Sequence, residues 1–152
     1  MEELKTLMFK IGEEYYGVNI KDVQGIENVK GFTNVPNTAE YVKGIINLRG
    51  DIIPVYSLRK KFGMEDLNRE ELSLIIVTIG DMQIALEIDI IDAIQDIDSS
   101  MIFEVPAIIK TPDEQYYEKV LNVNNKIVVV LNVGKMLSAD EKENISKLVS
   151  KN

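Results

Sequence analysis

The stretch that decides the fold is residues 41–63, which read Tyr-Val-Lys-Gly-Ile-Ile-Asn-Leu-Arg-Gly-Asp-Ile-Ile-Pro-Val-Tyr-Ser-Leu-Arg-Lys-Lys-Phe-Gly. Two apolar runs, 45–48 and 52–56, flank the short segment Arg49-Gly50-Asp51. Apolar strands joined by a few residues that include glycine are typical of a β-hairpin. The stretch therefore predicts a tight hairpin, followed by a single helical turn that Gly63 ends.

Three residues of this stretch have specific physical roles. Gly44 allows the backbone to approach another segment closely, or to adopt dihedral angles that other residues avoid. Pro54 lacks an N–H donor, so its strand is expected to be an edge strand or to turn that donor position outward. Arg49 lies at the turn, where its guanidinium either reaches carbonyls or a carboxylate of a neighbouring segment or is only a surface charge.

The order of elements upstream of this stretch recurs in the second half of the chain. Alternating apolar residues predict a hairpin over residues 7–20, then a helical turn at 21–23 and a third strand around 26–29. An offset of 68 residues (79 − 11 = 68) lays Ile11 on Ile79 without a gap. An offset of 75 (122 − 47 = 75) lays the central hairpin on a second one. The two gapless matches in the same order indicate an internal duplication.

Duplication of a five-stranded unit predicts the fold class. Five short antiparallel strands are too few for a sandwich but enough for a small closed barrel, and two such barrels would stabilise each other. We therefore expect a mainly β protein of two pseudo-symmetric five-stranded barrels packed together. The expected subdomains are residues 8–70 and 71–137. Residues 138–152 form a C-terminal helix that opens with a capping box at Ser138 and covers a barrel edge.

The composition excludes several classes of function. The chain has 152 residues, no histidine and no cysteine. Histidine-based catalysis, imidazole metal ligands and thiolate chemistry are therefore excluded, and no metal-ligand spacing or nucleotide-binding motif occurs. We expect no catalytic residues, no metal and no cofactor. A carboxylate-based hydrolase remains as an alternative, although it would need two acidic groups that converge in a pocket.

Charge and hydropathy limit the partners and the location. The formal net charge of −8 opposes binding to phosphate backbones and anionic lipid, so we expect no nucleic acid. No apolar run is long enough to span a membrane, so no direct membrane insertion is expected. No secretory signal is visible at the N-terminus, which favours a cytoplasmic location.

Residues 41–63 resemble the signature of the CheW-like family, the coupling proteins of bacterial chemotaxis. The family pattern has a Gly, then Asn-Leu-Arg-Gly, then Pro-Val and an Asp-Leu. It is matched by Gly44, Asn47 to Gly50, Pro54, Val55 and Leu58. Residues 9–18, 23–24, 35–37, 86–89 and 126–137 also resemble the family. The sequence departs from the pattern at Gly25, where many members carry Glu, at Ser57, and at Glu118-Lys119.

The resemblance implies two SH3-like barrels and an adaptor without enzymatic activity. Its partners would be the regulatory domain of a histidine autokinase and the cytoplasmic tip of a methyl-accepting chemoreceptor, so that the chain is recruited to receptor arrays at the membrane. The tip would occupy a groove at the barrel junction. Val23, Ile26 and Gly44 match receptor-binding positions, whereas Asn47 and Arg49 match an interface or loop-bracing motif. Val23 and Ile26 could equally be core residues. The alternative function is a regulatory module of a larger signalling protein.

Overall fold

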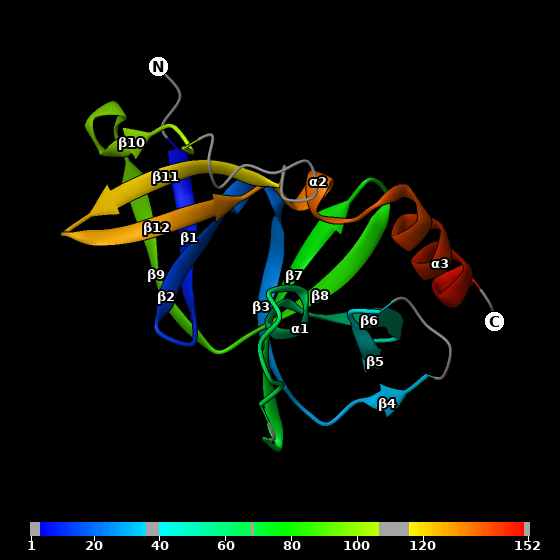
Figure 1. Cartoon of the computed structure of the whole chain (residues 1–152). Coiled ribbons are helices and arrows are strands. Elements are labelled where there is room, and N and C mark those ends of the chain that lie inside the picture. Colours follow the sequence, from blue (N-terminus) through cyan, green and yellow to red (C-terminus); the bar gives the residue numbers. More distant parts are fainter. Residues whose placement is uncertain (1–3, 36–39, 68, 107–115, 151–152) are drawn as a thin grey trace. The chain divides into compact units, whose positions relative to one another are not determined.

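The computed structural model describes residues 4–35, 40–67, 69–106 and 116–150 (Figure 1). The chain divides into two compact units, and each unit draws on both halves of the sequence. Unit 1 consists of Met1–Val23 and Asp89–Met136, and unit 2 consists of Gln24–Ile88 and Leu137–Asn152. These bounds differ from the expected subdomains 8–70 and 71–137.

Unit 1 is built on a six-stranded sheet in the order β10-β11-β12-β2-β1-β9. Its strands are antiparallel except for the parallel pair of β12 and β2. Buried side chains, among them Met8, Leu121 and Val128, form its core. The elements are β1 (Leu4–Ile11), β2 (Glu14–Asn19), η1 (Ile20–Asp22), β9 (Ile90–Ile97), η2 (Ser99–Met101), β10 (Ile102–Phe103), β11 (Tyr117–Val123), β12 (Lys126–Leu131) and α2 (Val133–Met136).

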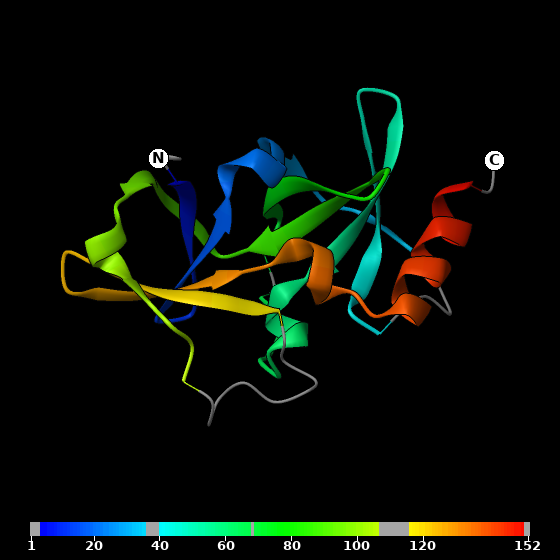
Figure 2. The same ribbon diagram turned by 90° about the horizontal axis from the view of Figure 1, so that it is seen from above.

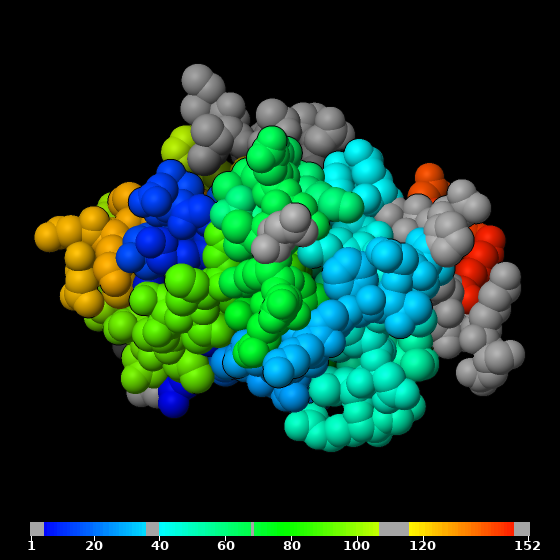
Figure 3. All heavy atoms as spheres, turned by 90° about the horizontal axis from the view of Figure 1, so that it is seen from below, coloured from blue at the N-terminus to red at the C-terminus, as the bar shows by residue number. Residues whose placement is uncertain are grey.

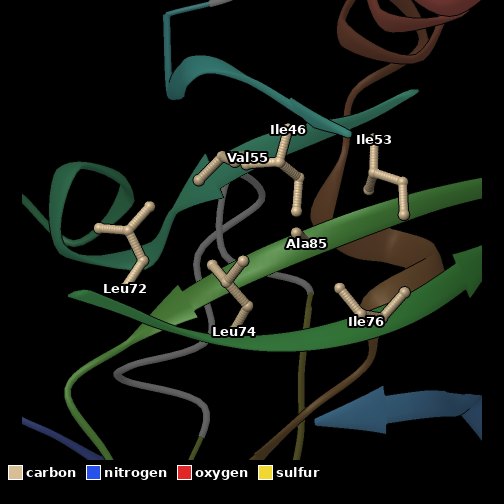
Figure 4. Close-up of a cluster of buried hydrophobic side chains, with 7 residues drawn as sticks. All are labelled: Ile46, Ile53, Val55, Leu72, Leu74, Ile76 and Ala85. Atoms are coloured by element: carbon tan, nitrogen blue, oxygen red, sulfur yellow. The ribbon is translucent and has the colours of Figure 1, made fainter. Parts of the chain in front are cut away.

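Unit 2 contains the second sheet, in the order β3-β7-β8-β6-β5-β4, with β6 and β8 parallel. The seven side chains in Figure 4 fill its core, where Val55, Leu74 and Ala85 are fully buried. The elements are β3 (Val23–Lys30), β4 (Thr33–Asn34), β5 (Val42–Leu48), β6 (Asp51–Ser57), α1 (Leu58–Lys61), β7 (Glu71–Ile79), β8 (Met82–Ile88) and α3 (Ala139–Ser150).

Each sheet therefore has five longer strands and one two-residue strand, β4 or β10. This confirms the mainly β class with two small β units and a C-terminal helix, and corrects the count of five strands to six. Pro54 does not lie in an edge strand, because β6 runs between β8 and β5. The pairing of β6 with β8 begins at Val55, so the missing N–H of Pro54 removes no bond from that ladder.

The duplication is visible in the pairing registers. Phe9 pairs with Tyr16 in the first hairpin, and Val77 pairs with Ile84 in β7–β8, at the offset of 68. The central hairpins agree at the offset of 75, since Asn47 pairs with Ile52 and Asn122 with Ile127. The parallel pairs also agree, because Val55 pairs with Ala85 and Val130 with Gly17.

The hairpins are exchanged between the halves. The β1–β2 hairpin of the first half lies in one sheet with β9 to β12 of the second half, and β7–β8 lies in the other sheet with β3 to β6 (Figures 1 and 2). In each sheet, a parallel strand pair, β12–β2 or β6–β8, joins the hairpin of one half to the strands of the other half. For this reason a division at residue 70 does not separate the two units, although the duplication itself was predicted.

The predicted capping box opens α3. Glu141 N donates to Ser138 Oγ at 3.1 Å, and Ser138 N donates to Glu141 Oε1 at 3.1 Å. The buried Ile145 anchors the helix in unit 2, and Tyr56 of β6 donates its hydroxyl to Glu141 at 3.2 Å. The contact with β6 is to an interior strand, and coverage of a barrel edge by this helix stays a prediction. Residues 36 and 37, which belong to the resemblance, lie outside the described part.

Candidate partner-binding surface

The β5–β6 turn has a backbone that is unusual for its residues. Arg49 has φ 53° and Gly50 has φ 92°, as a two-residue turn that matches strand twist requires. Asn47 Oδ1 accepts a hydrogen bond from Gly50 N at 2.9 Å and closes the turn. Asn47 therefore stabilises the turn that presents Arg49.

Arg49 projects from this turn, with 75% of its side chain exposed. Its guanidinium nitrogen NH2 lies 3.3 Å from Glu27 Oε1 on β3, an ion pair across sequence-distant strands of unit 2. Of the roles expected for Arg49, contact with a carboxylate of a neighbouring segment is the one that the described residues show. Sequence reasoning missed Glu27, which lies two residues after Gly25 on the same half-buried side of β3.

Strand β3 carries the two apolar residues expected at the partner surface. Its side chains alternate between half-buried and exposed. Ile26 is 41% exposed, so the alternative interpretation of Ile26 as a core residue is wrong. Val23, which begins β3, is half-buried and thus lies between the core and the surface interpretations.

Gly44 lies where another segment crosses β5 closely. A Cβ atom added there would be 2.1 Å from the Thr33 carbonyl oxygen and 2.7 Å from Phe32 Cδ2. No side chain fits at that separation, so glycine allows β4 to pair with β5. This confirms the predicted close approach of the backbone and gives Gly44 a structural role.

An open hollow of about 430 Å³ lies in unit 2 beside these residues. Residues 29–33 line one side of it and residues 45–47 the other. Figure 3 shows the same face, with the light blue segment of β3 and its following loop beside the cyan and teal segments of β5 and β6. The hollow thus adjoins the turn of Asn47 and Arg49.

A buried ionic cluster underlies β5, and the sequence did not predict it. Lys43 Nζ lies 2.9 Å from Glu87 Oε1 and 2.9 Å from Asp66 Oδ2, and the side chains of Lys43 and Glu87 are each 6% exposed. Burial raises the pKa of Glu87, whereas the hydrogen bond from Lys43 opposes that shift. The charge of Glu87 inside the apolar run 84–88 indicated that this residue needs a buried partner. The sequence could not identify that partner, because Lys43 lies 44 residues away.

Exposed isoleucines recur at equivalent positions of the two units. Ile26 matches Ile94 at the offset of 68, and Ile52 matches Ile127 at the offset of 75; all four are exposed. Ile90 and Phe103 of unit 1 are also exposed.

The chemistry of this surface is that of binding. Asp66 and Glu87 converge on Lys43, which engages both of them, and neither lines the hollow. Within the described ranges, no group of three or more acidic residues is arranged to hold a metal ion. No helix of the described residues is long and apolar enough to cross a membrane. The fold and surface define a β-barrel binding module.

Comparisons with known proteins agree with this class. The family model described as "CheW-like domain" matches residues 5–141. The chain is 31% identical to the chemotaxis protein CheW of Helicobacter pylori, over 91% of this chain and 84% of the relative. It is 28% identical to that of Klebsiella aerogenes, over 89% of this chain and 82% of the relative. The crystal structure of the scaffolding protein TtCheW from Thermoanaerobacter tengcongensis superposes with a TM-score of 0.81 at 31% identity, covering 93% and 97% of the two chains.

The chain belongs to the CheW-like domain family. It is a non-catalytic chemotaxis adaptor, which excludes the carboxylate-based hydrolase, and its two units are SH3-like barrels.

Proposed function

We propose that this adaptor couples the cytoplasmic tip of a methyl-accepting chemoreceptor to the regulatory domain of a histidine autokinase. The receptor tip binds at β3 and the β5–β6 turn of unit 2, and a separate surface binds the kinase domain. The chain acts in the cytoplasm and reaches the membrane through the receptor.

The observation that carries the receptor site is the exposed Ile26 on β3, the strand whose Glu27 holds Arg49. A receptor tip is a helical hairpin, and a helix presents apolar anchors at three- and four-residue spacing to such a surface. Ile26 supplies an apolar contact, and Val23 extends it toward the start of the strand. Arg49, which is mostly exposed, supplies a charged contact at the rim.

The roles of Gly44 and Asn47 in this proposal are indirect. Gly44 keeps β4 against β5, and Asn47 keeps the turn of Arg49 in shape. Both therefore preserve the surface without needing to touch the receptor. The alternative, a regulatory module of a larger signalling protein, would use the same surface in a different chain.

Reconstitution tests this function. Kinase activity is measured with receptor-containing vesicles, with and without the chain. We expect the chain to raise activity and to make it respond to the receptor's ligand, while the chain alone leaves the free kinase unchanged. Equal activity with and without the chain would refute the coupling role.

A further inference from the structure

Unit 1 depends on a hairpin that is connected to it in sequence only through unit 2. The β1–β2 hairpin lies between β12 and β9, so its removal would leave two separate pieces of the sheet. Five of its hydrophobic residues are buried, namely Leu7, Met8, Phe9, Ile11 and Val18, and Met8 belongs to the core cluster of unit 1. Unit 1 is therefore incomplete without a hairpin at this place.

The hairpin already behaves as a transferable element within the chain. Equivalent hairpins, β1–β2 and β7–β8, each complete the sheet of the other half, in identical registers. The bonds that hold β1–β2 do not depend on covalent continuity. They are the ladders to β9 and β12, the bond from Gly12 N to Asp89 Oδ2 at 2.7 Å, and the bond from Asp89 N to Lys10 O at 3.1 Å.

The connection that follows the hairpin has the properties of a hinge. The three residues of η1 include none that is buried, and Lys21 is exposed. The bond from Lys21 N to Asn19 Oδ1, at 3.0 Å, is local and exposed. Extension of η1 would thus sacrifice little burial. Asp89, which follows β8 at the position equivalent to Lys21, differs from it. Asp89 is buried, and both its amide and its carboxylate form hydrogen bonds, so the second connection is less suited to act as a hinge.

We propose that the β1–β2 hairpin is exchangeable between molecules, so that two copies of this chain can complete each other's unit 1. Every contact of the hairpin with β9, β12 and Asp89 would then form between copies, with no new interface chemistry required. The resulting dimer carries each binding surface twice. The inference does not depend on the identity of the partners.

The chain offers a direct test because it has no cysteine. Lys5 and Asp96 are register partners on β1 and β9, with exposed side chains 4.0 Å apart. The Lys5→Cys and Asp96→Cys single variants are unfolded, mixed, refolded together at several concentrations and oxidised. Mass spectrometry then identifies the disulfide-linked heterodimer. The double variant on one chain shows that the geometry allows the disulfide.

We expect the heterodimer to form at least tenfold more than the mismatched pair Lys5→Cys with Asp81→Cys, since Asp81 lies in the β7–β8 turn and is not a register partner of β1. Its yield should rise roughly tenfold from about 10 to 100 µM, because closure within one chain competes at an effective concentration on the order of mM. Mixing the singles after separate refolding should give little product.

Equal yields from the matched and mismatched pairs, or from co-refolded and separately folded samples, would overturn the proposal. A second measurement needs no substitution. After the unmodified chain is refolded at about 1 mM, size-exclusion chromatography should show a dimer that survives dilution. Unfolding this dimer and refolding it at low concentration should return the monomer. A dimer that dissociates on dilution, or no dimer, would also overturn it.

Discussion

The guanidinium of Arg49 lies 3.3 Å from the carboxylate of Glu27, and this ion pair ties the β5–β6 turn to β3 in unit 2. Arg49 holds φ 53°, a conformation that costs a residue with a side chain about 1 kcal/mol or more relative to glycine. An arginine at such a position contributes little to folding. We therefore expect Arg49 to act through contacts of its exposed guanidinium with a partner, and not through the stability of the fold.

Substitution of Arg49 should separate function from stability. Arg49→Ala removes an exposed pair, so the free energy of unfolding should change by less than about 0.5 kcal/mol. Receptor control of the kinase should fall, and Arg49→Lys should restore it only in part, because an ammonium cannot reproduce a planar fork. Glu27→Gln serves as the matched variant and should weaken coupling through the same pair. Unaltered kinase activation by Arg49→Ala in reconstituted assemblies would show that Arg49 is only a surface charge.

The duplicated turns allow an internal comparison. Asn47 Oδ1 accepts from Gly50 N at 2.9 Å, and Asn122 Oδ1 accepts from Asn125 N at 3.2 Å. Asn47→Ala and Asn122→Ala should each lower the free energy of unfolding by about 1 kcal/mol, since each loses one such bond. Urea unfolding measures both. A large loss for one variant and none for the other would show that the two turns are not equivalent.

Gly44→Ala should be destabilising for a steric reason. The new Cβ would lie 2.1 Å from the Thr33 carbonyl, so β4 or β5 must move, at a cost of about 1–3 kcal/mol. Lys119 occupies the equivalent position in β11, and Lys119→Ala is the control, expected within about 0.5 kcal/mol of the parent. A Gly44→Ala variant as stable as the control would contradict the close approach seen here.

The Lys43–Glu87 pair predicts opposite responses from its two members. Lys43→Met removes the ammonium paired with the buried carboxylate of Glu87, although Arg69 still acts on it, and should cost up to about 3–5 kcal/mol at neutral pH. Glu87→Gln leaves Lys43 paired with Asp66 and should cost much less. Adding Glu87→Gln to Lys43→Met should recover part of the loss. Equal losses from the two single variants would contradict this arrangement.

The pH dependence follows from the direction of the shift. The pKa of Glu87 is raised, chiefly by burial, so the folded state binds the proton more tightly than the unfolded state. Its stabilising contribution is present below the unfolded-state pKa and is lost as the pH rises through the folded-state pKa. The stability of Glu87→Gln relative to the parent should therefore increase from acid to neutral pH. A difference independent of pH would exclude a raised pKa.

Substitutions on β3 test the receptor site. Ile26→Asp places a charge where an apolar anchor would be buried on binding and should weaken receptor association by about 1–3 kcal/mol. The fold should persist because Ile26 is exposed, and kinase binding should change less. Val23→Asp should weaken receptor binding too, with some loss of stability from its half-buried position. Binding isotherms and melting curves measure both, and normal receptor affinity of a folded Ile26→Asp would refute the site.

Local patterns predicted most of the fold. Alternation, turn residues and the capping box at Ser138 predicted the hairpins, the turn at Arg49 and α3, because these depend on neighbours in sequence. The offsets of 68 and 75 predicted the equivalent registers. The exchange of hairpins was not predictable, since either pairing satisfies the same apolar alternation. Only the long-range parallel pairs, such as Val55 with Ala85, distinguish the two arrangements.

The candidate site was predictable in part for the same reason. The motif singled out Gly44, Asn47 and Arg49. The close approach of Thr33 explains Gly44, and the hydrogen bond that closes the turn explains Asn47. The partners Glu27 and Glu87 were missed because an ion pair between distant strands leaves no periodic signal. The exposure of Ile26 could not be predicted from the sequence of β3. Val23 and Val29 lie on one side of this strand and Ile26 on the other, so alternation does not say which side faces the core.

The measurement that tests the central claim most directly is a bridging assay with three purified components. A receptor-tip fragment is immobilised, and retention of the kinase regulatory domain is measured with and without the chain. We predict that the chain retains the kinase domain on the receptor, and that Ile26→Asp weakens bridging by the same factor as receptor association while still binding the kinase domain in solution. If the kinase domain instead releases the chain from the receptor by competition, the two partners share one surface and the coupling account is contradicted.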